Sequence, residues 1–193
     1  MTNLLHIDSS IRREGSVTRE ITGSFADVWR SANPEGGYTY RDLNATPVPH
    51  VDGTEHGVQA ELVAEVRAAD VILIGAPMYN FSIPSTLKAW IDQVATREFF
   101  PREDGTYELG GKRVVVVTAR GGSYKPGTPR EGFDFQEPYL RAVLSMIGLD
   151  RNLEFVHAEL TLADVNPQLH QFRELAVESL ADAHRVVKEL ASA

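Results

Sequence analysis

The sequence predicts an α/β protein in which helices cover both faces of a five-stranded parallel sheet. Residues 71–74 and 114–117 are continuous apolar runs rich in β-branched side chains. Such runs are typical of parallel strands that are buried on both faces. Segments with helical spacing of apolar residues alternate with strand-like runs along the chain. This βαβαβαβαβα order is the pattern of a three-layer domain.

The first elements show this alternation. Residues 4–7 form a short apolar strand, and residues 38–43 alternate like an edge strand or second strand. The helix predicted for residues 18–30 gathers its apolar side chains on one face. These side chains are Ile21, Phe25, Val28 and Trp29. A second helix is predicted further along the chain, and the apolar side chains on one side of it are Val58, Leu62, Val63 and Val66.

The later elements follow in the same way. Helices are predicted for residues 85–95 and 138–147, and Gly148 ends the second because glycine accepts a left-handed conformation. Their inward-facing residues are Leu87, Trp90, Ile91 and Val94 in the first, and Leu140, Val143, Leu144 and Ile147 in the second. Residues 153–156 form the fifth strand, and residues 167–191 are expected to form one long final helix.

Right-handed crossovers leave few topologies for five such strands. The flavodoxin-like strand order 2-1-3-4-5 suits them better than the six-stranded dinucleotide-binding fold does. The chain has 193 residues and shows neither an internal repeat nor a linker. Residues 1–193 are therefore expected to form a single domain.

The composition excludes several classes of protein. The chain has no cysteine, which excludes disulfides, thiolate nucleophiles and cysteine-held metal clusters. Its formal net charge of −8 argues against a general nucleic-acid binder. It has neither an apolar run of the roughly 20 residues that cross a bilayer nor the pattern of a signal peptide. We therefore expect a soluble, cytoplasmic domain without a nucleic-acid or membrane partner.

In a sheet of this order, ligands bind beyond the carboxyl ends of the strands, near the first, third and fourth strands. The first of these loops, residues 9–18, carries hydroxyl groups at Ser10, Ser16 and Thr18 beside a helix that should begin at about Val17. A helix N-terminus offers unpaired N–H groups to a phosphate. Alternatively, Ser16 is only the N-cap of this helix. Neither a Walker loop nor a GxGxxG motif is present.

The second loop, residues 75–84, combines flat and apolar side chains with one amide. Met78, Tyr79 and Phe81 surround Asn80. These groups suit a flat heteroaromatic ring with polar edges. The alternative is that Met78 and Phe81 simply cap the core.

The third loop follows the fourth strand. It begins with Ala119 and Arg120 and continues with the paired glycines Gly121 and Gly122. Glycines at this place allow a positive φ and a close approach of the backbone to a ligand. All three ligand-facing loops therefore carry residues that suit a ligand.

Side-chain machinery for catalysis is not evident. The histidines are His6, His50, His56, His157, His170 and His184, with no i, i+4 pair and no HExxH motif, so a metal site is not expected. His6 and His157 lie on predicted strands and should be structural. No serine lies in a GxSxG motif. A phosphate loop and a ring loop without catalytic side chains indicate a cofactor that supplies the chemistry, and FMN fits.

Three motifs give the chain a resemblance to a known family. They are Ser9-Ser10 with Ser16-Val17-Thr18, then Ala76-Pro77-Met78-Tyr79-Asn80-Phe81, then Thr118-Ala119-Arg120-Gly121-Gly122. On these motifs the whole chain closely resembles the FMN-dependent NADH azoreductases, also described as FMN-dependent NADH:quinone oxidoreductases. The resemblance implies a flavodoxin-like fold, one FMN per subunit and NADH as electron donor. It also implies quinones or azo compounds as acceptors, and a homodimer.

The same resemblance implies roles for individual residues. It assigns Ser10, Ser16, Val17 and Thr18 to the FMN phosphate; Met78, Tyr79, Asn80 and Phe81 to the ring; and Ala119, Arg120, Gly121 and Gly122 to its polar edge. Phe99 and Phe100 would wall the substrate pocket of this or the neighbouring subunit. No side chain is assigned a catalytic role, because FMN carries the chemistry.

We therefore expect an NADH:quinone oxidoreductase that also cleaves aromatic azo compounds to amines, by ping-pong transfer of two electrons through FMN. The alternative is a flavodoxin-type FMN electron carrier, although the Thr-x-Thr-Gly-x-Thr loop usual for flavodoxins is missing. A flavin-free phosphoester hydrolase ranks last because it has no visible nucleophile. The choice between NADH and NADPH stays open, and Arg120 or Arg130 would favour the extra phosphate of NADPH.

Overall fold

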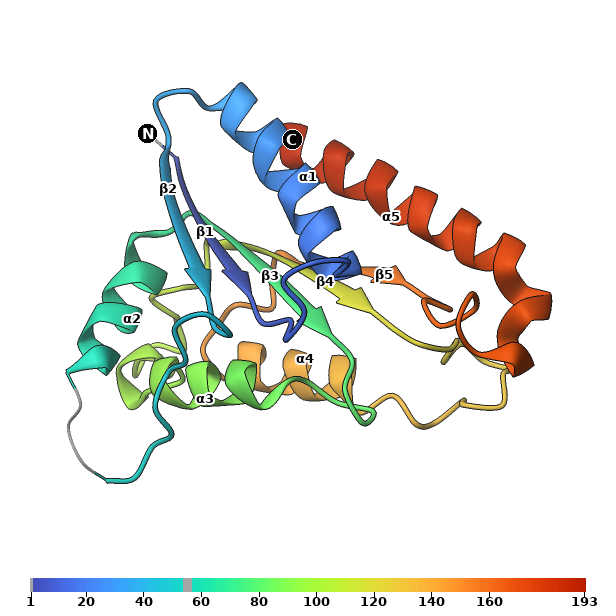
Figure 1. Ribbon diagram of the computed structural model, residues 1–193. Helices are drawn as coiled ribbons and strands as arrows, with labels where there is room; N and C mark the ends of the chain where they lie inside the picture. Colours follow the sequence, from blue (N-terminus) through green and yellow to red (C-terminus); the bar gives the residue numbers. More distant parts are fainter. Residues whose placement is uncertain (1, 54–56) are drawn as a thin grey trace.

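The computed structural model describes residues 2–53 and 57–193. Five parallel strands form one sheet in the order β2-β1-β3-β4-β5, with helices on both faces (Figure 1). The strands are β1 (Asn3–Asp8), β2 (Gly37–Asp42), β3 (Val71–Pro77), β4 (Arg113–Ala119) and β5 (Leu153–Ala158). The predicted architecture and strand order are confirmed.

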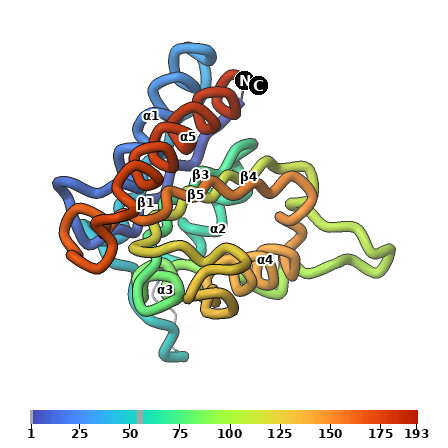
Figure 2. The backbone as a smooth tube through the Cα atoms, turned by 90° about the vertical axis from the view of Figure 1, so that its right-hand side faces the viewer, coloured from blue at the N-terminus to red at the C-terminus, as the bar shows by residue number. Residues whose placement is uncertain are grey.

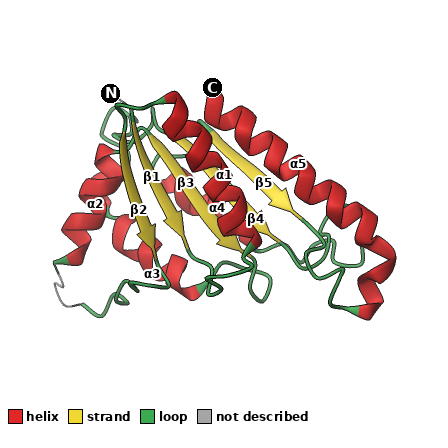
Figure 3. Cartoon of the chain, turned by 45° about the horizontal axis from the view of Figure 1, so that its top comes forward, coloured by secondary structure: helices red, strands yellow, loops and turns green. Residues whose placement is uncertain are grey.

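The helices form two layers around this sheet. They are α1 (Val17–Ala32), α2 (Val58–Ala68), α3 (Ser85–Val94), α4 (Gln136–Met146) and α5 (Arg173–Ser192). Helices α1 and α5 lie side by side on one face of the sheet (Figure 3), and α2, α3 and α4 lie on the other. Figure 2 shows the strands between these two layers. No helix in the described part of the chain is long and apolar enough to span a membrane.

The core is divided by the sheet into two apolar clusters. All seven residues of β3 are buried, which confirms that this strand is covered on both faces. Ile72 and Ile74 pack in the cluster with α2, α3 and α4, whereas Leu73 packs in the cluster with α1 and α5. Phe25 of α1 is fully buried in the second cluster. Fully burying a side chain of this size contributes about 1.5–3 kcal/mol.

The last helical segment is shorter than predicted. Pro167–Phe172 form a 3₁₀ helix, and α5 begins only at Arg173. Leu169 and Phe172 are spaced by three residues, which suits the three-residue turn of a 3₁₀ helix. None of the side chains in this 3₁₀ segment is buried, so no packing against the sheet holds it in α-helical geometry. A second 3₁₀ turn, Arg97–Phe99, was not predicted.

Two glycines shape the sheet and its connections. Gly148 follows α4 with a φ of 78°, which confirms the predicted left-handed stop. A Cβ at Gly75 would lie 2.4 Å from the Oδ1 atom of Asp8. Gly75 therefore lets the carboxyl end of β3 lie directly beside the buried carboxylate that ends β1.

Candidate functional site

The loops after β1, β3 and β4 lie next to one another at the carboxyl edge of the sheet, as predicted. The backbone N–H and the Oγ of Ser9 both donate to the carbonyl of Gly75, at 3.1 and 2.7 Å. The N–H of Met78 donates to the carbonyl of Ala119 at 2.9 Å. These bonds join the first loop to the second and the second to the third.

The first loop leads into the N-terminus of α1. Ser16 is the N-cap, and its Oγ accepts a hydrogen bond from the N–H of Arg19 at 3.4 Å. The same Oγ lies 3.2 Å from the Oγ1 of Thr18. None of the described residues accepts a hydrogen bond from the N–H groups of Val17 or Thr18. The N-cap role is therefore confirmed, and beside it two N–H groups remain for an anion.

Arg19 organises the first loop, a role that was not predicted from the sequence. Its Nε and Nη2 donate to the carbonyls of Arg12 and Ser10, each at 2.9 Å. Its Nη2 also lies 2.8 Å from the Oδ1 of Asp42. The guanidinium thus supports the loop from within the protein. A cation in the first turn of a helix opposes the helix dipole. This unfavourable position of Arg19 is the feature of the sequence that could have indicated its structural role.

A buried carboxylate lies directly before this loop. Asp8 accepts hydrogen bonds from the hydroxyls of Thr22 and Tyr40, each at 3.0 Å. Its Oδ2 lies 3.4 Å from the Nε2 of His6. Burial alone would raise the pKa of Asp8, but the hydrogen bond and charge of His6, together with the charge of Arg19, lower this pKa. Burial and the Asp8 carboxylate raise the pKa of Tyr40.

The second loop contains a tight and strained turn. Tyr79 and Ser82 exchange backbone hydrogen bonds of 2.9 and 3.1 Å, and between them Asn80 and Phe81 have φ values of 49° and 70°. Such conformations cost on the order of 1–3 kcal/mol each for a non-glycine residue and cluster at functional sites. The N–H of Ile11 donates to the hydroxyl of Tyr79 at 3.2 Å, which fixes the turn against the first loop. Phe81 is 39% exposed, so it does not cap the core.

The paired glycines of the third loop differ from the prediction in their backbone conformation. Neither Gly121 nor Gly122 has a positive φ. A Cβ at Gly121 would lie 2.7 Å from the Cδ1 of Leu162, and one at Gly122 would lie 3.4 Å from the Cδ of Arg130. A Cβ at Gly121 would therefore require Leu162 to shift, whereas one at Gly122 would make only ordinary van der Waals contact with Arg130.

Arg120 is buried behind the third loop among three carboxylates. Its Nη2 lies 2.9 Å from the Oδ2 of Asp134 and 3.6 Å from the Oε2 of Glu137. Its Nη1 lies 3.9 Å from the Oε1 of Glu159. The side chain is 4% exposed. This guanidinium therefore supports the third loop from within the protein.

His157 joins the same cluster. Its Nδ1 lies 2.7 Å from the Oγ1 of Thr118, and its Nε2 lies 2.9 Å from the Oε2 of Glu137. This pairing confirms the structural role expected for it. Burial and the nearby charge of Arg120 lower the pKa of His157 below its ordinary value of 6.5.

The stability of the fold should depend on the protonation of His157. Its pKa is lower in the folded than in the unfolded chain, so the unfolded chain binds the proton more readily. The neutral ring contributes fully to the free energy of unfolding at a pH above the pKa of His157 in the unfolded chain. This contribution is lost as the pH falls through the lower pKa of His157 in the folded chain. Urea unfolding at pH 7.5 and 5.5 should show a smaller pH dependence for His157→Gln than for the parent protein. An unchanged dependence would refute this assignment, and His184→Gln is the control.

The two aromatic residues expected to wall a substrate pocket follow α3 and pack against the apolar cluster on the face of α2, α3 and α4. Phe99 is fully buried, with the guanidinium carbon of Arg67 5.2 Å from its ring centroid. Arg67 lies at the end of the sheet where the strands begin, since its carbonyl accepts a hydrogen bond from Lys112 just before β4. Phe100 packs partly buried against the same core cluster.

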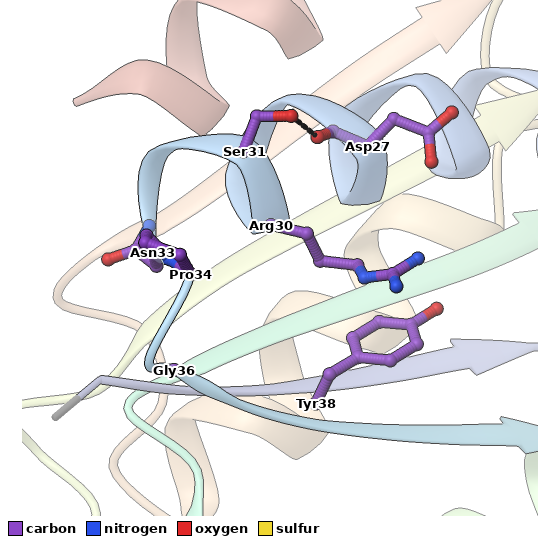
Figure 4. Close-up of a pocket in the computed structure, with 7 residues that line it drawn as sticks. All are labelled: Asp27, Arg30, Ser31, Asn33, Pro34, Gly36 and Tyr38. Atoms are coloured by element: carbon purple, nitrogen blue, oxygen red, sulfur yellow. Dashed lines mark hydrogen bonds between the residues drawn. The ribbon is translucent and has the colours of Figure 1, made fainter.

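Two cavities also lie toward the beginnings of the strands. The larger, of about 580 Å³, lies between the end of α1 and the start of β2 (Figure 4). There Arg30 lies over the ring of Tyr38, 5.3 Å from its centroid. The hydroxyl of Tyr38 lies 2.9 Å from the Nδ1 of His6, which confirms that this histidine is structurally engaged. The second cavity, of about 380 Å³, lies between β2 and α2. Neither is lined by the three loops.

No group of three or more His, Cys, Asp or Glu side chains in the described part of the chain could hold a metal ion. His56, one of the histidines considered above, lies outside the described residues.

A parallel sheet of this order, with a helix N-terminus and a strained loop at its carboxyl edge, defines a flavodoxin-like protein. Residues 2–180 match the model of a family described as having a flavodoxin-like fold. The chain belongs to this family.

Two relatives are similar over nearly the whole chain. The FMN-dependent NADH:quinone oxidoreductase of Frankia casuarinae is 44% identical and is covered completely, as is this chain. The FMN-dependent NADH:quinone oxidoreductase of Streptomyces coelicolor is 45% identical, over 95% of this chain and 91% of the relative.

Solved structures support the same fold. An azoreductase from Bacillus anthracis has a TM-score of 0.83 at 21% identity, with 100% of this chain and 99% of that chain covered. An FMN-dependent NADH-azoreductase from Bacillus anthracis in complex with FMN has a TM-score of 0.81 at 24% identity, with 100% and 98% covered.

Proposed function

We propose that this protein is an FMN-dependent NADH:quinone oxidoreductase. Relatives with this activity are more than 40% identical over nearly the whole chain. The observation that carries the proposal is the meeting of the open N-terminus of α1 with the strained turn from Tyr79 to Ser82 at one edge of the sheet. The azoreductases of the same fold support aromatic azo compounds, cleaved to amines, as further acceptors.

The phosphate end of FMN fits the first loop. The N–H groups of Val17 and Thr18, together with the hydroxyls of Ser10, Ser16 and Thr18, would hold the phosphate. Ser10, Ser16 and Thr18 are all buried, so hydrogen bonds to a charged ligand would be shielded from water and strong. Arg19 keeps the loop in shape by binding two of its carbonyls.

The ring end fits the second and third loops. Met78, Tyr79, Asn80 and Phe81 would lie along the ring, with Ala119, Gly121 and Gly122 at its polar edge. Nearby, the Nε2 of Gln136 donates to the carbonyl of Ala76 at 3.0 Å. The buried Oε1 of Gln136 has no hydrogen-bond partner among the described residues, so a polar atom remains unsatisfied beside the ring loop.

The chain's own part in the reaction is to bind, orient and exclude water. When bound, FMN supplies the group that takes up and passes on two electrons. Arg120 holds the third loop in place from behind, through the carboxylates that surround it. We further infer that residues 1–193 form a single FMN-binding domain, and that the protein is a homodimer in which Phe100 faces the neighbouring subunit.

The order of binding can be tested by steady-state kinetics. NADH and the quinone should occupy the same face of the site in turn, so one must leave before the other enters. Initial velocities at several concentrations of both should give parallel double-reciprocal lines. Intersecting lines would show that both ligands bind at once and would contradict the ping-pong scheme.

A further inference from the structure

One cation beside the ring loops differs from its neighbours. Arg130 is exposed, and its guanidinium carbon lies 5.9 Å from the ring centroids of both Phe81 and Tyr124. Its Nη1 donates to the hydroxyl of Tyr124 at 3.2 Å. Its Cδ packs over Gly122. Arg130 thus connects the second loop with the third at the outer rim of the candidate site.

The other cations of the third loop, and Arg19 behind the first, are paired with carboxylates. Arg19 pairs with Asp42, and Arg120 lies among three carboxylates. Lys125, on the same loop as Arg130, lies 3.5 Å from the Oε2 of Glu159. No carboxylate in the described ranges, residues 2–53 and 57–193, forms an ion pair with Arg130. Its charge therefore remains available to a ligand.

The loop that carries Arg130 is held by its own hydrogen bonds. The Oγ1 of Thr128 donates to the carbonyls of Ser123 and Lys125, at 3.0 and 2.8 Å. The N–H of Gly127 donates to the Oε2 of Glu131 at 2.7 Å, which engages the carboxylate adjacent to Arg130 in sequence. The guanidinium is therefore held over two aromatic rings, and less side-chain entropy is lost when it binds.

We propose that Arg130 binds an anionic group of the molecule that occupies the ring face, and so determines specificity. The proposal rests on the proposed function, because it assumes that the ring loops hold FMN. The anion would be the diphosphate of NADH or an acidic substituent of the acceptor. A guanidinium offers paired donors that match phosphate, sulfonate and carboxylate oxygens. In a chain with a net charge of −8, an uncompensated cation at the rim offsets the repulsion of such ligands.

The test uses the FMN-bound protein with Arg130→Gln, the charge-retaining Arg130→Lys, and Lys125→Gln as the matched control. The acceptors are 1,2-naphthoquinone and its 4-sulfonate, which differ by one anionic group. If Arg130 binds the acceptor's anion, Arg130→Gln lowers kcat/KM for the sulfonate about tenfold or more and leaves the neutral quinone unchanged. If it binds the diphosphate, the KM for NADH rises to a similar extent with both quinones. Arg130→Lys should retain part of the effect, and Lys125→Gln should change neither parameter.

Two results would overturn the proposal. One is an Arg130→Gln variant with all of these constants unchanged. The other is a loss of FMN affinity in this variant, which would make Arg130 part of the cofactor's own binding site. A protein that binds FMN but oxidises no NADH with any quinone would instead contradict the proposed function. In that case, equilibrium binding of the sulfonated quinone to the parent and to Arg130→Gln still tests the role of Arg130, and equal affinities would refute it.

Discussion

Replacing Ser16 and Thr18 together by alanine should weaken FMN binding by about 100-fold or more. Each hydroxyl would donate to the charged phosphate, and a hydrogen bond to a charged group contributes about 1.5–3 kcal/mol. Two such bonds correspond to a change of at least about two orders of magnitude in the dissociation constant. Quenching of FMN fluorescence on titration with the protein measures this constant directly.

The controls for this prediction lie on the same helix. Ser24 and Ser31 donate to the carbonyls of Glu20 and Asp27, at 3.0 and 2.8 Å, so Ser24→Ala and Ser31→Ala should leave the affinity for FMN unchanged. Ser16 is also the N-cap, and its replacement by alanine costs about 0.5–2 kcal/mol of stability. Ser16→Gly keeps most of this capping stability and provides a second variant if the first folds poorly. Unchanged affinity in a folded double variant would place the phosphate elsewhere.

Arg120→Met should destabilise the fold by about 3–5 kcal/mol. Removing one partner of a buried charge cluster leaves the remaining charges without compensation. Here the carboxylates of Asp134, Glu137 and Glu159 would lose the cation that lies among them. The free energy of unfolding, measured by urea titration at neutral pH, gives the loss.

Arg141 provides a matched control because it pairs with Glu137, one of these three carboxylates, at the surface of the protein. Its Nη2 lies 2.6 Å from the Oε1 of Glu137, and its side chain is 53% exposed. Arg141→Gln should cost no more than about 1 kcal/mol, as is typical of surface ion pairs. If the two variants lost the same stability, burial of Arg120 would not be the source of its effect.

Most of the fold could be predicted from periodicity. The continuous run at residues 71–74 and the helical face of α1 depend only on which side chains must leave water, and this information is local. The error at Pro167–Phe172 has a local cause too: apolar residues spaced by three fit a 3₁₀ turn as well as an α-helix. Sequence spacing alone does not distinguish these two helices when few contacts hold the segment.

The site could be predicted only in part. The hydroxyls around Val17 and the aromatic loop at Met78 are short motifs, so they are visible in the sequence. The groups that hold these loops are not, because they pair across long separations. Arg19 meets Asp42 from the end of another strand, and Arg120 meets Glu159 beyond β5. Such pairs depend on strand order and register, so the support that Arg120 gives to the third loop could not be predicted from the sequence.

We propose that the carboxyl edge of the sheet binds FMN and passes electrons from NADH to a quinone. The most direct test is the absorption spectrum of the purified protein, mixed with FMN and freed of excess, before and after adding NADH and then a small quinone. We predict flavin bands that bleach with NADH and return with the quinone. A colourless protein that retains no FMN would contradict the cofactor site, and flavin bands indifferent to NADH would contradict the proposed enzyme.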